Sequence, residues 1–69
     1  MNTNLTEREY EILELIVEGL SNPEIAKELF IEACTVRVHV SSLLRKLEVN
    51  NRTQLVTIAF RSGLVKWGF

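Results

Sequence analysis

The stretch that decides the fold is residues 31–49, IEACTVRVHVSSLLRKLEV. With about 100° of rotation per residue, one side of a helix over 33–48 collects an apolar stripe. The stripe consists of Val36, Val40, Leu43, Leu44 and Leu47. Val38 is outside it, because it falls on the opposite side, between Arg37 and Ser41. An apolar residue that points outward beside an arginine needs an explanation beyond packing.

The outward side of this predicted helix carries no acidic residue. It consists of six side chains: Cys34, Arg37, Val38, Ser41, Ser42 and Arg45. Glutamate and lysine four residues apart ordinarily stabilise a helix face that only meets solvent, and this face has no such pair. Arginine bonds guanine edges with two hydrogen bonds, serine donates or accepts, and a valine methyl packs against a thymine methyl. The face therefore suits a DNA major groove, and a surface helix that merely lacks acids remains the alternative.

Three more helices are predicted, joined by short loops. Thr6 and Glu9 have the spacing of a capping box, as do Ser21 and Glu24, so each pair marks a helix start. An asparagine of the segment EVNN is expected to cap the last helix, and Gly63 suits its left-handed end. The helices are expected over about 6–18, 22–29, 33–48 and 51–62. The expected fold class is all-α, a four-helix bundle in which the second and third helices form a helix-turn-helix.

Length and composition exclude several classes of protein. Sixty-nine residues suffice for one domain, so residues 1–69 are expected to form it without a linker or second domain. With no apolar run long enough for a membrane and no basic, apolar leader, the expected location is the cytoplasm. The single cysteine, Cys34, and the single histidine, His39, form no metal cluster, so neither metal nor cofactor is expected. They also lie about 140° apart around the helix, so no nucleophile and base pair supports an enzyme.

Charge is divided unequally along the chain. Residues 1–32 hold eight acids and two bases, whereas residues 33–69 hold six bases and one acid. The net charge of −1 hides this asymmetry. Such a division is typical of a protein with a polyanionic partner for one face, and a dipolar surface without a ligand is the alternative.

Several motifs, in order, resemble the LuxR/GerE-type helix-turn-helix domain, the output domain of many bacterial response regulators and quorum-sensing regulators. They are LTERE, GLSNPEIAKEL, TVRVHVSSLLRKLEV, RTQ and GLV, and they span Leu5 to Val65. The resemblance implies a sequence-specific DNA-binding transcriptional regulator whose third helix enters the major groove. It implies base contacts by Arg37, Val38 and Ser41. Phosphate contacts are expected from Ser21, Asn22, Thr35, Arg45 and Lys46. His39 is expected to pack at the core edge or hold the backbone, and a base contact is the alternative.

The fourth predicted helix is apolar over about half of its circumference, more than one packed face requires. The resemblance implies that the surplus forms a homodimer, so that two recognition helices reach successive major grooves. The interface is expected to include Ile58, Phe60 and Trp67. The alternative is that the tail VKWGF folds back as a lid, with Trp67 or Phe69. Double-stranded DNA is the expected partner, and RNA polymerase is a further candidate.

Two positions depart from the family pattern. Glu32 stands where members usually carry serine or a similar capping residue, and Ser41 stands where many carry a basic one. Both changes predict weak, salt-sensitive binding to random DNA. They also leave open a module of the same fold that pairs with or masks another regulator without binding DNA. Only MNTN precedes the first helix, so a stand-alone regulator and the output domain of a longer one both remain open.

Overall fold

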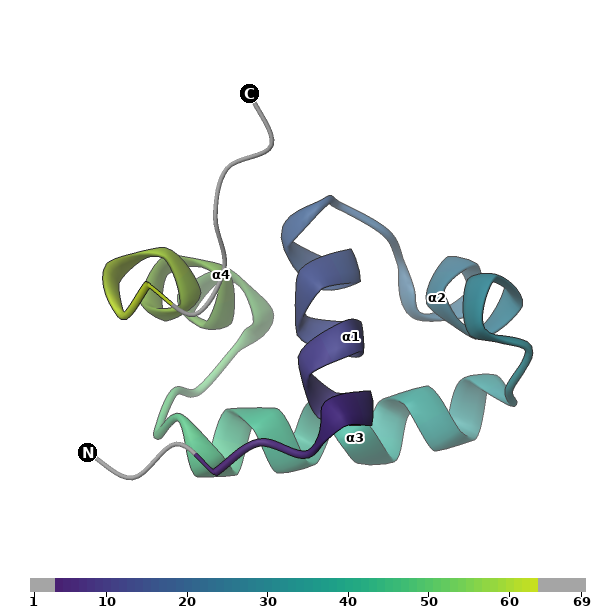
Figure 1. The fold of residues 1–69 in the computed structure, drawn as a ribbon, viewed down its shortest axis with the longest axis horizontal. Coiled ribbons are helices and arrows are strands. Elements are labelled where there is room, and N and C mark those ends of the chain that lie inside the picture. Colours follow the sequence, from purple (N-terminus) through teal and green to yellow (C-terminus); the bar gives the residue numbers. More distant parts are fainter. Residues whose placement is uncertain (1–3, 64–69) are drawn as a thin grey trace.

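The computed structural model describes residues 4–63, which form four helices. They are α1 (Glu7–Val17), α2 (Asn22–Leu29), α3 (Ala33–Lys46) and α4 (Arg52–Arg61). Within this part of the chain there is no strand, so the predicted all-α class is confirmed. Figure 1 shows α3 along the base of the molecule, with α1 standing across its middle and α2 and α4 on either side. Each predicted helix is present, with ends that differ by no more than two residues.

Side-chain caps set the starts of α1, α2 and α4, as the sequence predicted. The Thr6 hydroxyl accepts a hydrogen bond from the Glu9 N–H at 3.1 Å, and the Glu9 carboxylate accepts one from the Thr6 N–H at 2.9 Å. Ser21 and Glu24 form a second capping box of the same kind. Asn51 caps α4 by accepting from the backbone of Gln54 at 2.9 Å. Because each cap satisfies an otherwise unpaired N–H, the chain has little freedom in where these helices begin.

A residue with positive φ ends each of the four helices: Gly19, Phe30, Glu48 and Gly63. Gly63 follows α4 with a φ of 71°, as expected, and a residue without a Cβ accepts this conformation at little cost. After α3 the left-handed residue is Glu48, with a φ of 57°. The chain turns there, which is why α3 ends at Lys46, two residues before the predicted end.

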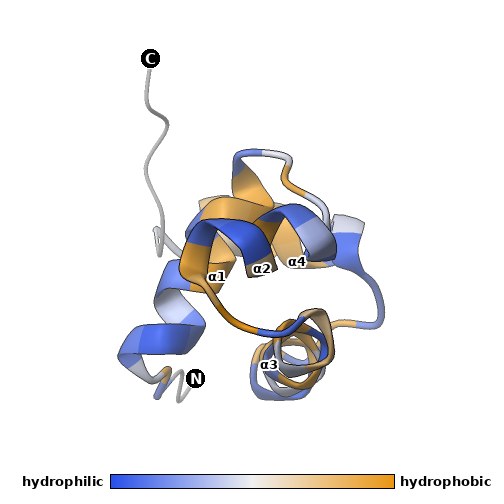
Figure 2. Cartoon of the chain, turned by 90° about the vertical axis from the view of Figure 1, so that its right-hand side faces the viewer, coloured by the Kyte–Doolittle hydropathy of each residue, from blue (hydrophilic) through white to orange (hydrophobic). Residues whose placement is uncertain are grey.

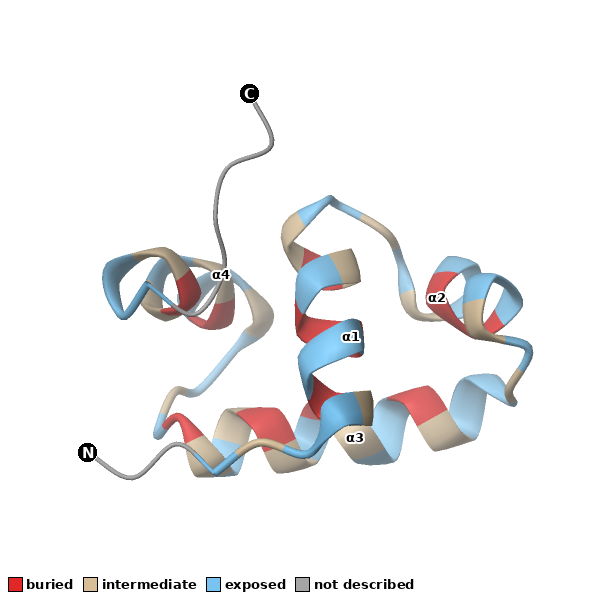
Figure 3. Ribbon diagram, in the orientation of Figure 1, coloured by how far each residue is buried: buried red, intermediate tan, exposed pale blue. Residues whose placement is uncertain are grey.

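One apolar core joins the four helices. All of them contribute buried residues, which are red on the ribbon of Figure 3. The core residues are Ile12, Leu13, Ile16, Ile25, Ala26, Val36, Val40, Leu43, Leu47, Leu55 and Ala59. In Figure 2 α3 is seen nearly end-on, beneath a layer that holds the other helices. One flank of α3 is therefore covered, and its far side is left to solvent. Among the described residues, no helix is long and apolar enough to cross a membrane.

Candidate DNA interface

The uncovered side of α3 carries the three predicted base-reading residues. Arg37, Val38 and Ser41 are all exposed, and the exposed fraction of Val38 is 67%. They lie within four residues of one another, so they share one helix face. The helix sequence ACTVRVHVSSLLRK contains no acid. The structure thus brings together an arginine, a hydroxyl and an apolar group on an acid-free surface.

Two arginines give this face its positive charge. Arg37 and Arg45 are exposed, and within residues 4–63 neither forms an ion pair. Arginine beyond the reach of carboxylates keeps its five N–H donors for a ligand. The exposed thiol of Cys34 lies on the first turn of the same helix. Thr35 is half-buried beside it.

The entry to α3 lacks the usual side-chain cap. Glu32 is the N-cap residue, and its exposed side chain makes no capping hydrogen bond. Only its backbone carbonyl contributes, by accepting from the N–H groups of Thr35 and Val36 at 3.0 and 3.1 Å. Glutamate is a weaker N-cap than serine. The carboxylate stands at the end of the helix that would otherwise attract a phosphate.

Ser42 was predicted to point outward with this face, and that placement is wrong. Its side chain is half-buried and donates a hydrogen bond of 2.6 Å to the Glu9 carboxylate of α1. Ser42 lies at the border of the outward side. At this border, the angle around the helix does not predict whether a side chain meets solvent or another helix. What decides is the position of α1, which crosses the middle of α3 (Figure 1) and brings Glu9 to Ser42.

Lys46 takes part in the same contact. Its ammonium group donates to the Glu9 carboxylate at 2.7 Å and to the carbonyl of Asn4 at 3.1 Å. Two of the three ammonium donors are therefore used inside the protein, and one remains for a phosphate. The phosphate role of Lys46 stays a prediction, but its first partner is Glu9. The sequence predicted Glu9 only as the capping partner of Thr6. Its contact with Ser42 and Lys46 was missed, although the two residues have i, i+4 spacing.

Glu9 is a buried acid whose charge is retained. Its exposed fraction is 4%. Burial by itself raises the pKa of this carboxyl. Hydrogen bonds from Lys46, Ser42 and the Thr6 backbone, together with the charge of Lys46, outweigh burial and lower the pKa to about 2. A buried carboxylate with this many donors stays ionised at neutral pH, and its hydrogen bonds are directional.

The start of α2 is held by an arginine that sequence reasoning also missed. Arg52, the first residue of α4, donates to the side-chain oxygen of Asn22 at 2.6 Å and to the carbonyl of Leu20. Because the Asn22 oxygen accepts from Arg52, the NH₂ group is the part of this side chain that could donate to a phosphate. At Ser21 the N–H already binds the Glu24 carboxylate at 2.7 Å, which also lowers the pKa of Glu24. A phosphate at this helix start would have to approach beside that carboxylate.

The predicted dimer surface is described only in part. Ile58 and Phe60 are half-buried and pack against the core, whereas Trp67 and the tail lie outside the described residues. A shallow hollow of about 230 Å³ lies beside Ile58. Its lining combines Val49, Thr53, Gln54, Thr57, Ile58 and Arg61.

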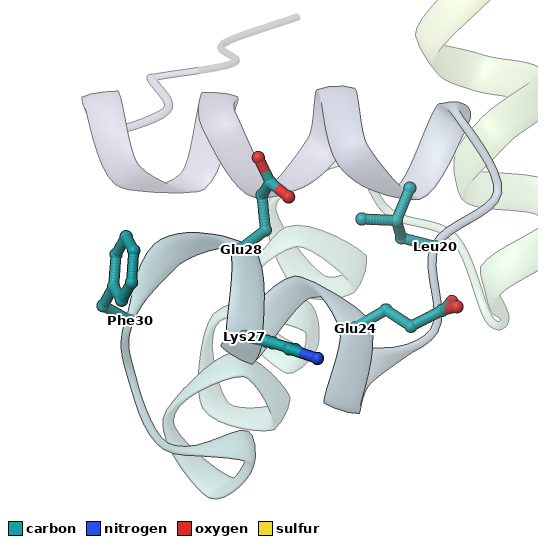
Figure 4. Close-up of a pocket in the computed structure, with 5 residues that line it drawn as sticks. All are labelled: Leu20, Glu24, Lys27, Glu28 and Phe30. Carbon is teal, nitrogen blue, oxygen red and sulfur yellow. The ribbon is translucent and has the colours of Figure 1, made fainter.

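A second hollow, of about 620 Å³, lies along α2. Figure 4 shows its lining side chains, which are Leu20, Glu24, Lys27, Glu28 and Phe30. Phe30 ends α2 in the left-handed conformation, with a φ of 58°, and its exposed fraction is 93%. Two glutamates make this hollow unlike the acid-free face of α3. No three His, Cys, Asp or Glu side chains of the described residues gather as a group that would hold a metal ion.

Comparison with known proteins agrees with this geometry. Residues 3–59 match the family model GerE, described as "Bacterial regulatory proteins, luxR family". The chain is 55% identical over 62 residues to the response regulator protein VraR of Staphylococcus aureus and to that of Staphylococcus saprophyticus. The match covers 90% of this chain and 30% of each relative, so the chain spans about a third of the length of these curated relatives.

Two solved structures share the fold. The structure of the transcription factor GerE superposes with a TM-score of 0.83 at 39% identity, covering 90% of this chain and 92% of that one. The response regulator ChrA of a heme-sensing two-component system gives a TM-score of 0.87 at 40% identity, covering 94% of this chain and 32% of that one. The chain therefore belongs to the luxR family of bacterial regulatory proteins, as a DNA-binding helix-turn-helix domain.

Proposed function

We propose that the chain binds double-stranded DNA sequence-specifically, with α3 in the major groove, and so regulates transcription. The observation that carries the proposal is the exposed, acid-free face of Arg37, Val38 and Ser41. Family membership supports DNA as the partner, and the chemistry of the face supports base reading. The proposed place of action is the cytoplasm, where bacterial DNA lies. Contact with RNA polymerase stays a prediction.

Val38 supports base reading more than phosphate binding. Leaving a valine exposed forgoes roughly 1.5 kcal/mol of burial free energy, which a thymine methyl would recover on contact. Arg37 on the preceding position is placed to bond a guanine edge. Arg45, two turns further along the same face, and the NH₂ group of Asn22 are the proposed phosphate contacts, with Thr35, Ser21 and Lys46 as weaker ones. Phosphate contacts fix the position of the helix, and the base contacts specify the sequence.

A homodimer through α4 completes the proposal. The hollow on α4 combines the apolar side chains of Val49 and Ile58 with polar ones from Thr53, Gln54, Thr57 and Arg61. A two-fold contact there would present two copies of α3 to one face of DNA and predicts a palindromic site. Sedimentation at micromolar concentration, with and without DNA, checks the dimer. A strict monomer in both conditions would contradict it.

The test of DNA binding starts from selection of bound sites out of random duplexes. Arg37→Ala is then expected to cost about 1–3 kcal/mol on the selected site and less on random DNA. Arg45→Ala is expected to weaken both equally and to lower the salt slope by about one, as for a phosphate contact. Fluorescence anisotropy against salt measures both. Equal losses for Arg37→Ala on the two duplexes would remove its base-reading role.

The competing interpretation, a module that pairs with another regulator without DNA, makes the opposite prediction. It expects no shift of a mixed-sequence duplex at low salt, either by the wild type or by Glu32→Ser. A salt-sensitive shift by the wild type excludes it.

A further inference from the structure

We infer that Glu9 is a positioning residue for DNA recognition: its carboxylate fixes the rotation of α3 about its own axis. The inference rests on the proposed function, since it concerns which side chains of α3 face the bases. Glu9 does not lie on α3 and is buried, so it does not touch DNA itself. Its effect would pass through the helix it holds.

The Glu9 carboxylate binds α3 at two points, Ser42 and Lys46, and we call this pair of contacts the grip. One carboxylate oxygen of Glu9 accepts from Ser42 at 2.6 Å, and the other accepts from Lys46 at 2.7 Å. Ser42 and Lys46 are four residues apart, so the two oxygens hold successive turns of α3 on the same flank. The second oxygen also accepts from the N–H of Thr6 at 2.9 Å. The carboxylate is thus fixed to the start of α1, which gives the grip a rigid base.

The grip lies on a different flank from the reading face. With Val36 at zero, the angles of Ser42 and Lys46 are about 240° and 280°, whereas Arg37, Val38 and Ser41 fall between about 100° and 200°. The apolar stripe alone decides which half of α3 faces the core, because the hydrophobic effect is not directional. Charge-assisted hydrogen bonds are directional and short. The two hydrogen bonds on this flank therefore resist a rotation of α3 about its own axis that the apolar contacts would tolerate.

A small roll matters for base reading. Since side chains extend about 5–6 Å from a helix axis, a roll of about 10° moves their ends by roughly 1 Å. Hydrogen bonds to base edges tolerate only a few tenths of an ångström in length. Contacts to random DNA are mainly ionic and tolerate such a shift. Loss of the grip is therefore expected to lower specificity more than affinity.

The experiment compares Glu9→Gln with Glu11→Gln as a matched control. Glutamine keeps the size of the Glu9 side chain and removes its charge, and Glu11 is an exposed neighbour paired only with Arg8 at 3.4 Å. Binding is measured on the duplex selected by the wild type and on random duplex, at a temperature where denaturation curves show both variants folded. We expect Glu9→Gln to lower the ratio of the two affinities about tenfold, with an unchanged salt slope on random DNA. Glu11→Gln should leave the ratio unchanged.

A purely structural role makes a different prediction. If Glu9 only stabilises the fold, Glu9→Gln lowers both affinities in proportion to the folded fraction and leaves their ratio unchanged, which overturns the inference. Should Glu9→Gln fail to fold, Ser42→Ala removes one of the two grip points and keeps the ion pair. It is then expected to lower the ratio about threefold, and an unchanged ratio overturns the inference as well. A wild type without any preferred site would instead overturn the proposed function, and this inference with it.

Discussion

The two flanks of α3 differ in what their polar side chains bind. On the outer flank Arg37, Val38 and Ser41 are exposed, and within residues 4–63 Arg37 forms no ion pair. On the inner flank Ser42 and Lys46 are bound to the buried carboxylate of Glu9. In the sequence, both flanks combine a hydroxyl with a basic side chain. The difference teaches that polarity on a helix does not identify a ligand face, because the neighbouring helix decides which polar groups are already satisfied.

Protonation of Glu9 is the largest expected effect and tests the inner flank. The pKa is about 2 in the folded protein against an ordinary value of 4.5. Because the folded-state pKa is the lower one, the stabilisation is complete above pH 4.5 and is lost as the pH falls toward 2. The shift corresponds to roughly 3 kcal/mol in the free energy of unfolding. Urea unfolding across this range measures it, with Glu9→Gln as control. The same acid dependence in both proteins would contradict the assignment.

Replacement of Lys46 by methionine breaks the grip from the other side. The Glu9 carboxylate would remain buried without its cation, and the expected loss of unfolding free energy is roughly 2 kcal/mol. This lies below the cost for a fully buried pair, because the side chain of Lys46 is 33% exposed. Arg45→Met, one position earlier on the exposed side, should change stability by less than about 0.5 kcal/mol. Equal losses in the two variants would remove the contrast between the flanks.

Val38→Ala tests the outer flank without touching a charge. It should weaken binding to the selected site by about 1 kcal/mol if the valine covers a thymine methyl, and leave the free energy of unfolding nearly unchanged. Val38→Thr is the matched control, since it keeps the shape and replaces one methyl by a hydroxyl. Anisotropy with a duplex carrying uracil in place of thymine provides the direct check. A similar loss on both duplexes would show that Val38 contacts something other than the methyl.

Glu32→Ser has the smallest expected effect and lies where the two flanks begin. Serine would supply the side-chain acceptor that this N-cap lacks, for a gain of about 0.5 kcal/mol in unfolding free energy. The substitution also removes a negative charge near the proposed position of the DNA phosphates, so binding to random DNA should tighten. Thermal unfolding and anisotropy at low salt measure the two effects. An increase in stability without tighter binding would place Glu32 away from the DNA backbone.

Much of the fold was open to prediction because its signals are local. The capping boxes at Thr6 and Ser21 depend on residues three apart, and the stripe on α3 depends only on helical periodicity. The exposed position of Val38 followed from the same periodicity. The contacts of Glu9 with α3 and of Arg52 with α2 were not predicted, because the partners are 33 and 30 residues or more away in the chain. No pattern in the local sequence predicts that residues so far apart in the chain are close in space.

The sequence by itself determined the four helices, the side of α3 that faces inward and the acid-free surface that faces away. Those features follow from hydrogen-bonding caps and from the burial of apolar area, both of which act over one or two turns. Only the tertiary structure decided that Ser42 and Lys46 meet Glu9, and that Asn22 meets Arg52. The crossing of α1 over α3 brings the first group together, and the long side chain of Arg52 reaches from the start of α4 to the start of α2. The physical reason is that buried charges must find partners, and which partner is near depends on how whole helices pack.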